Sequence, residues 1–339
     1  MTKNKVILVF LVTLSVISIF LSARYGAVSL GISEMTSSLS KFFLGKEEFT
    51  LHERIFLELR LPRAFLAFFT GAALATGAVL MQGLFRNPLV DSGMIGISSG
   101  AAFGAALFFV MGSTFTFIPM WSLPFAAITG ALLSSVILIA LSGTQSRGKN
   151  STVMILLIGI AINALFMSGT GFLSYIARDP QARSITFWGM GTLSGANWHS
   201  VKMVAGSTTL VFMISWIFSK SLNALILGEE EAFLLGTHVK RLKRWLIIGN
   251  VIICAVATAY VGVIGFVGLV VPHMVRLSGV SDHRYLLPFS ALLGGVLLGF
   301  TDLLARMIVP PAELPLSIIT SLAGVPLFIL LLRKNYYTY

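Results

Sequence analysis

Long runs without a charged side chain are the feature that most constrains how this chain can fold. Residues 64–85 form one such run, which follows the tetrad Arg60-Leu-Pro-Arg63 and ends at Arg86. An α-helix of that length rises about 33 Å, enough to cross the hydrocarbon core of a bilayer. We expect a membrane-spanning helix here, with Pro62 in its first turn, where the missing N–H costs nothing. Arg60 and Arg63 precede this helix and are more than membrane topology requires at that end. We interpret them as a contact surface for a partner.

Similar charge-free stretches recur along the whole chain, and the composition agrees with them. The sequence has 339 residues, of which 56% are hydrophobic and only 11% are charged, whereas an ordinary soluble domain has about 25% charged residues. The chain is therefore a polytopic membrane protein. Its net charge of +11 is explained by basic loops at the membrane surface, and we expect no nucleic-acid partner. The stretches are 6–23, 64–85, 92–146, 150–177, 203–219, 245–275, 285–301 and 314–332.

The stretches predict an all-α membrane protein with ten transmembrane helices in one domain, residues 1–339. The stretch 92–146 is long enough for two helices, with a break between Ile118-Pro119 and Pro124. The stretch 245–275 is ambiguous, because glycines near 262–268 interrupt it and allow either one span or two. Ten spans place both basic chain ends in the cytoplasm, which the positive-inside rule favours over nine. We therefore predict ten.

Two charged segments lie outside the predicted spans. Residues 24–63 form a sizeable external loop, which we interpret as a docking surface. Residues 220–244 are the longest charged cytoplasmic segment, in which acidic residues precede basic ones, as suits the dipole of a short helix. Apolar side chains in such a segment usually pack on something. Two interpretations stay open, an interfacial helix on lipid headgroups and a docking helix for a soluble subunit. The residues concerned are Gly228, Glu229, Glu230, Glu231, Phe233, Leu234, Leu235 and Gly236.

The chain shows no reactive constellation of its own. Residues 143–150 nearly match the phosphate-loop pattern, but Asn150 replaces the hydroxyl residue that would hold Mg²⁺, and no strand precedes the segment. The five histidines are widely spaced, and the single Cys254 permits no intrachain disulfide. We expect a transport subunit rather than an enzyme, with no cofactor and no bound metal.

An ordered set of motifs resembles the permeases of ABC importers for iron–siderophore, haem and cobalamin, the FecCD type of type II importer. The resemblance covers nearly the whole chain and is highly specific because ten blocks occur in the family's order. The blocks are Arg60-Leu-Pro-Arg63, 71–77, 81–89, 96–102, 228–236, 265–273, 282–284, 305–306, 313–315 and 324–326.

The resemblance implies an importer in the bacterial cytoplasmic (inner) membrane, surrounded by lipid, with both termini in the cytoplasm. It implies two permease subunits, identical or paralogous, two cytoplasmic ATPase subunits and an external solute-binding protein. In the family, arginines matching Arg60, Arg63 and Arg306 meet glutamates on the binding protein. Segment 228–236 is similar to the coupling helices that insert into the ATPase, where ATP hydrolysis takes place.

The pathway and the substrate are less clearly indicated. The fifth span, which lines the pathway in the family, carries the polar candidates Asn163, Ser168 and Thr170, although such residues also serve as interhelical contacts. Residues 183–191 resemble haem-type permeases, but siderophore permeases carry similar sequences. Haem is favoured slightly over a ferric siderophore, with cobalamin third. The alternative function is a secondary transporter driven by an ion gradient. It would need an intramembrane carboxylate, for which Asp302 is the candidate.

Overall fold

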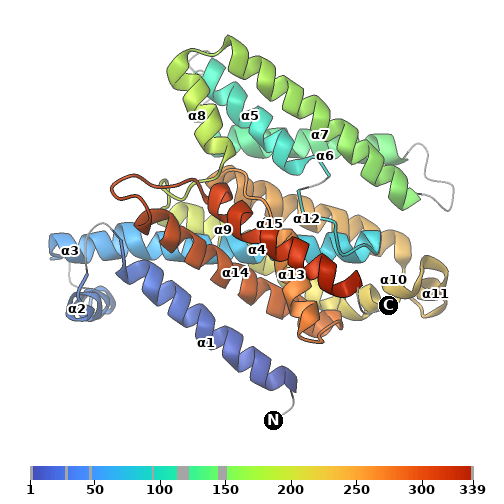
Figure 1. Ribbon diagram of the computed structural model, residues 1–339, viewed down its shortest axis with the longest axis horizontal. Coiled ribbons are helices and arrows are strands. Elements are labelled where there is room, and N and C mark those ends of the chain that lie inside the picture. The colour runs from blue at the N-terminus through green and yellow to red at the C-terminus, as the bar shows by residue number, and fades with distance from the viewer. Residues whose placement is uncertain are drawn as a thin grey trace.

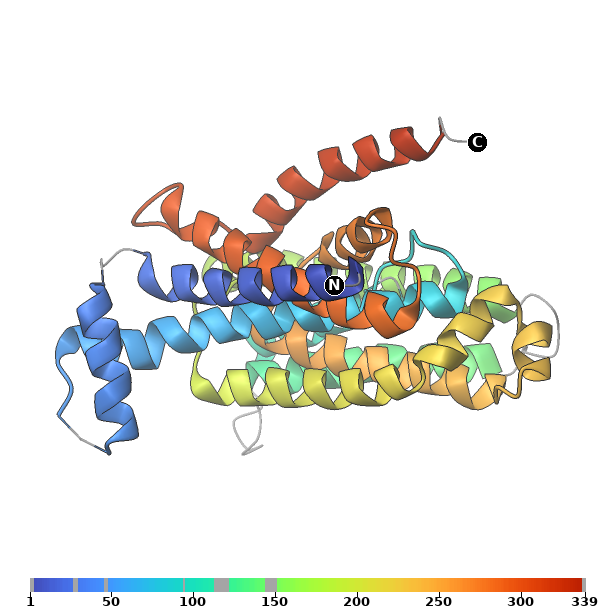
Figure 2. The ribbon, with the colours of Figure 1, turned by 90° about the horizontal axis from the view of Figure 1, so that it is seen from below.

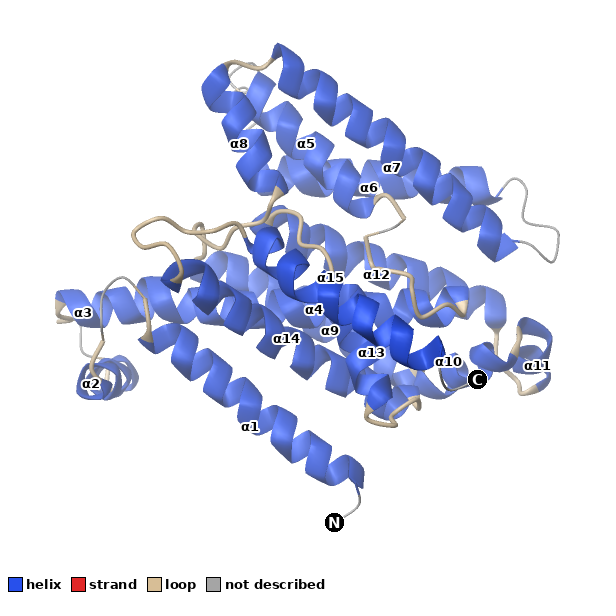
Figure 3. Cartoon of the chain, viewed as in Figure 1, coloured by secondary structure: helices blue, strands red, loops and turns tan. Residues whose placement is uncertain are grey.

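The computed structural model describes residues 3–26, 30–45, 48–93, 95–112, 122–143 and 151–336. These residues are almost entirely helical and contain no β-strand (Figure 3), which confirms the all-α prediction. The helices are α1 (Lys3–Arg24), α2 (Ile32–Phe43), α3 (Leu51–Arg54), the π-helical turn η1 (Ile55–Arg60), α4 (Leu61–Phe85), α5 (Ile97–Met111), α6 (Leu123–Gly143), α7 (Ser151–Ile176), α8 (Asp179–Gly189), α9 (Trp198–Ile217), α10 (Ser219–Leu227), α11 (Glu229–Leu234), α12 (Val239–Val261), α13 (Val267–Leu277), α14 (His283–Met307) and α15 (Leu316–Tyr336).

Ten of the helices in the described part of the chain are apolar, in agreement with the ten predicted. Seven are long and apolar enough to cross a bilayer, and the remaining three apolar segments, Ile97–Met111 in α5, Val267–Leu277 in α13 and Leu316–Leu330 in α15, are shorter. The stretch 245–275 does hold two helices, because α12 ends at Val261 and α13 begins at Val267. Helix α13 has only 11 residues, too few to cross the bilayer alone. The expected break at 118–124 lies mostly outside the described residues, and so do residues 144–150 of the phosphate-loop near-match.

Helix α4 is the centre of the bundle, and every residue from 70 to 84 is buried. It packs on α14, α12, α9 and α13, while α5 to α8 form a neighbouring layer (Figure 1). Close approach depends on small residues. A Cβ added to Gly71 would lie 2.1 Å from the Gly294 carbonyl oxygen, and one added to Gly104 would lie 2.0 Å from that of Ala126. These glycines therefore allow tight packing between neighbouring helices.

Pro62 lies in the first turn of α4, as predicted, but the helical turns of α3 and η1 directly precede it. The helix begins at Leu51, after the N-cap Thr50, and runs without interruption to Phe85. A proline inside a helix normally leaves a backbone carbonyl without a donor. Here η1 widens the helix, so that the Leu61 N–H reaches back five residues. The Leu57 carbonyl, five residues before Pro62, accepts instead from Trp198 Nε1 at 3.0 Å.

The two charged segments lie at opposite ends of the bundle. Residues 24–63, expected as a loop, contain α2, α3 and η1, which lie at one end, whereas α10 and α11 lie at the other (Figures 1 and 2). Helix α1 starts on the side of the bundle where α11 lies, and helix α15 finishes on the same side (Figure 1). Helix α14 extends between the two ends, because its first residues contact α10 and its last turn approaches the start of α4.

Candidate functional site

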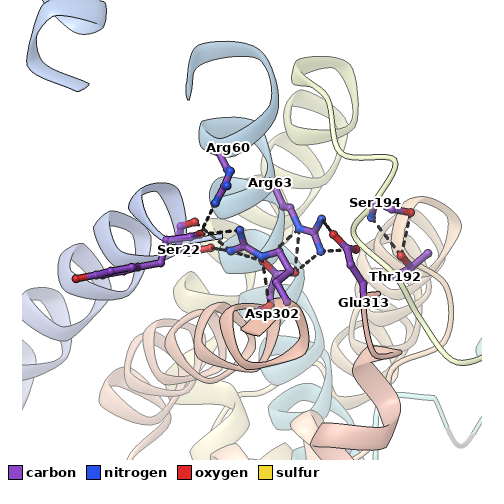
Figure 4. Close-up of polar contacts among 9 residues, drawn as sticks. Ser22, Arg60, Arg63, Thr192, Ser194, Asp302 and Glu313 are labelled. Atoms are coloured by element: carbon purple, nitrogen blue, oxygen red, sulfur yellow. Dashed lines mark hydrogen bonds and ion pairs between the residues drawn. The ribbon is translucent and has the colours of Figure 1, made fainter. Parts of the chain in front are cut away.

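Two of the three predicted arginines, Arg63 and Arg306, pair with one buried carboxylate, that of Asp302, at the α3 end. The third, Arg60, lines the same cavity (Figure 4). Asp302 lies on α14 and has no exposed surface. Arg63 donates to it from Nη2 at 2.8 Å and from Nε at 3.0 Å. Arg306, one helical turn after Asp302, forms an ion pair with it at 3.0 Å. The buried carboxylate therefore fixes the position of two guanidinium groups from two different helices.

A second carboxylate holds Arg63 from the solvent side. Glu313 follows α14, and its side chain is 38% exposed. Its two oxygens accept from Arg63 Nη1 at 2.7 Å and from Nη2 at 2.9 Å. Two parallel bonds of this kind are the favoured geometry between a guanidinium and a carboxylate. Arg63 is thus held between an internal and an external acid.

Arg60 and Arg306 also bind the carboxyl-terminal end of α1. Both donate to the Tyr25 carbonyl, Arg306 at 3.0 Å, and Arg306 also donates to the Ser22 carbonyl at 3.0 Å. Carbonyls at the end of a helix lack intrahelical donors and carry partial negative charge. The arginines therefore join α1, α4 and α14 at this end.

The cluster is less exposed than a bare basic platform, but it keeps excess positive charge. Arg60 is only 8% exposed and Arg306 9%. Three arginines against Asp302 and Glu313 leave one net positive charge. A cavity of about 230 Å³ opens beside them, lined in addition by Leu59, Leu193, Ser194, Ala196, Pro310 and Pro311. The surface therefore combines a cavity with one net positive charge.

At the opposite end, α11 presents apolar side chains to the surface. Phe233 is 70% exposed, Leu234 83% and Leu235 65%, while Ala232 is buried beneath them. A groove of about 980 Å³ runs beside Phe233 and Leu234 to the start of α12. Glu230 and Glu231 are exposed, whereas Glu229 forms an ion pair with Lys243 at 2.5 Å, which ties α11 to α12. Most of the sequence-predicted residues thus form one exposed amphipathic surface, whereas Gly228 is buried and Glu229 is half-buried.

The segment that carries α11 is attached to the first turn of α14. Asn223 on α10 donates to Asp282 at 2.7 Å, and its amide oxygen accepts from the His283 N–H at 2.9 Å. The Arg284 guanidinium and the Asn223 amide hold the pKa of Asp282 well below its usual range, so that the carboxylate stays charged. Helix α14 therefore contacts the α11 end through Asp282 and carries the arginine cluster at its other end.

The polar candidates on α7 are only partly brought together. Asn163 and Thr170 line a cavity of about 450 Å³ between α7 and residues 263–265, together with Asp91, Ser98 and Ser99, among others. Ser168 does not line this cavity and is exposed on α7. The sequence reasoning missed Asp91, which lies in the connection between α4 and α5 rather than in a span.

Comparison with known proteins explains why these features occur together. The chain matches the FecCD transport family over residues 13–334. The chain belongs to the FecCD family. One relative of this FecCD permease is the hemin transport system permease protein HmuU of Yersinia pestis, 42% identical over 98% of the chain and 97% of the relative.

Other comparisons agree on the family and the fold. The cobalamin import system permease protein BtuC of Halobacterium salinarum is 40% identical over 82% of the chain and 73% of that protein. A solved structure described as an inward-facing conformation of a metal-chelate type ABC transporter superposes with a TM-score of 0.84. It is 32% identical and covers 97% of this chain and 99% of that one. The protein is therefore an ABC importer permease, a transport subunit of a family that serves haem-, cobalamin- and siderophore-type substrates.

Proposed function

We propose that this FecCD permease imports an iron complex, with haem favoured over a ferric siderophore and cobalamin third. The observation that carries the choice of substrate is the similarity to the hemin permease HmuU, which extends over 98% of the chain. The cobalamin permease BtuC is nearly as similar in identity but over 82% of the chain. In this proposal the protein works as a homodimer or with a close paralogue, in the cytoplasmic membrane. Two ATPase subunits and a solute-binding protein complete the importer.

Arg60, Arg63 and Arg306 form the external docking site for the solute-binding protein. The excess positive charge and the adjoining cavity support this role, because acidic side chains on a partner would be steered toward them. Charge complementarity of this kind mainly fixes the orientation of the partner and its association rate. The proposal places the arginine end outside and the α11 end, with both chain termini, in the cytoplasm.

Helix α11 and its flanking residues contact the ATPase. Three exposed apolar side chains beside a groove are the kind of surface that a partner protein buries. Residues Gly228 and Gly236 bound this surface, and both have positive φ, 143° and 81°, which favours glycine. The connection of α10 to α14 through Asn223 and Asp282 would carry movements from the ATPase toward the arginine cluster.

The substrate pathway includes the polar face of α7. Asn163 and Thr170 border the cavity, and Ser168 lies on the exposed side, where a second permease subunit would complete the lining. The alternative, an ion-coupled transporter that uses Asp302, is disfavoured because Arg63 and Arg306 already neutralise that carboxylate.

Substrate-stimulated ATP hydrolysis tests this proposal. The permease would be purified with the ATPase encoded beside it and mixed with the neighbouring solute-binding protein, loaded in turn with haem, a ferric siderophore or cobalamin. We expect the largest stimulation with haem. Stimulation by cobalamin alone would refute the choice of an iron complex, and no co-purifying ATPase would refute the assembly itself.

A further inference from the structure

The guanidinium of Arg63 is already occupied by carboxylates of the same chain. Asp302 accepts from Nε and Nη2, and Glu313 accepts from Nη1 and Nη2. A guanidinium has five N–H groups in a fixed planar fork, and four of them are used by these two acids. An acidic side chain from a partner therefore cannot form a two-bond pair with Arg63 while both resident acids remain.

The two resident carboxylates differ in how readily they can leave. Asp302 is fully buried on α14, and Arg306 holds it as well. Glu313 is 38% exposed, lies in the connection between α14 and α15, and has Arg63 as its ion-pair partner. Burial raises the pKa of Glu313, but the hydrogen bonds to Arg63 and the positive charges of Arg63, Arg306 and Arg60 together outweigh burial and lower the pKa below its usual range. Glu313 is thus a charged, accessible and displaceable ligand of Arg63.

We propose that Glu313 occupies the place of the binding protein's carboxylate, and that docking exchanges one acid for the other on Arg63. The inference rests on the proposed docking role of the arginines. Glu313 already makes the two-bond geometry that an incoming glutamate or aspartate would make, and it lines the same cavity as Arg60, Arg63 and Arg306. In the undocked state it neutralises a cation that would otherwise be left partly unpaired.

Exchange has a measurable consequence for affinity. The incoming carboxylate gains only the difference between its own pair with Arg63 and the pair it displaces. Removing the resident charge should therefore strengthen docking. Exposed and half-exposed pairs are worth up to about 1 kcal/mol, so we expect Glu313→Gln to tighten binding by about threefold to fivefold at low salt.

A binding measurement with a charge-matched control tests the exchange. The full permease–ATPase complex in lipid nanodiscs would be titrated with the solute-binding protein encoded beside it, at low and at physiological ionic strength. Asp179→Asn is the control, because Asp179 is exposed at the start of α8, outside residues 24–63, and has no side-chain hydrogen bond or ion pair among the described residues. It removes one acidic charge without releasing Arg63. A thermal unfolding curve shows whether each variant is folded, and Glu313→Ala provides a second test.

The outcomes separate the exchange from the docking role on which it rests. Tighter binding by Glu313→Gln and Glu313→Ala, with Asp179→Asn within twofold of the wild type, would support the exchange. Unchanged or weaker binding by folded Glu313 variants, or an equal gain from Asp179→Asn, would overturn it. Arg63→Glu tests the docking role separately. If it does not weaken binding, the arginines are not the docking site. If it does, a failure of the Glu313 variants refutes only the exchange.

Discussion

Replacing Asp302 by asparagine should destabilise the arginine end strongly, since it removes one charge that two buried arginines share. At an effective dielectric constant of about 20, charges about 4 Å apart attract by about 4 kcal/mol. The pairs with Arg63 and Arg306 thus amount to about 8 kcal/mol before the cost of desolvation. That cost offsets much of the gain, and removing one partner of a buried pair typically costs about 3–5 kcal/mol. We expect the free energy of unfolding to fall by an amount in this range. The loss is not larger because Arg63 still pairs with Glu313, and Arg306 still donates to carbonyls at the end of α1.

Thermal unfolding of the purified permease in detergent measures this loss. An unfolding entropy of about 2.1 cal/mol/K per residue over 339 residues is about 0.7 kcal/mol/K, so the midpoint should fall by about 4–7 °C. Asp179→Asn is the matched control, because Asp179 is exposed at the start of α8 and should shift the midpoint by less than about 1 °C. If Asp302→Asn unfolds within 1 °C of the wild type, the ion pairs do not hold this end together.

Two further predictions concern the proposed partner surface and pathway. Phe233→Asp should abolish ATPase co-purification and uptake without affecting membrane insertion. The control is Leu44→Asp, which changes a side chain of similar exposure at the opposite end and should leave co-purification intact. Retained co-purification in the Phe233 variant would contradict the role of α11. Thr170→Val should lower substrate uptake severalfold, because Thr170 lines the α7 cavity. Thr129→Val removes the same hydroxyl with the same kind of bond to its own helix, and equal effects on uptake would count against the cavity as part of the pathway.

The number of apolar helices and the exposed position of segment 228–236 could be predicted from the sequence because both follow from local patterns. Runs without charged residues indicate which segments can enter lipid. Apolar residues within a charged segment, as in 228–236, indicate an exposed amphipathic turn. The ion pair between Asp302 and Arg306, four residues apart on α14, is local in the same sense. These features depend on residues that are close together in the chain.

The features that the sequence did not reveal depend on contacts between distant segments. Pro62 is tolerated inside a helix because Trp198, far along the chain, donates to the Leu57 carbonyl. Arg63 is neutralised by Asp302 and Glu313, which come from the other end of the sequence. The excess of arginines indicated a partner, but the sequence alone does not reveal which acids the fold brings to each arginine.

ATP-dependent uptake into proteoliposomes tests the central claim most directly. The permease would be reconstituted with its neighbouring ATPase, with the solute-binding protein and labelled haem supplied on the side of the arginine cluster and ATP on the side of α11. We predict haem accumulation that requires ATP and the binding protein and persists when proton and sodium gradients are collapsed with ionophores. Accumulation that proceeds without ATP and stops when those gradients are collapsed would contradict the account and favour an ion-coupled transporter.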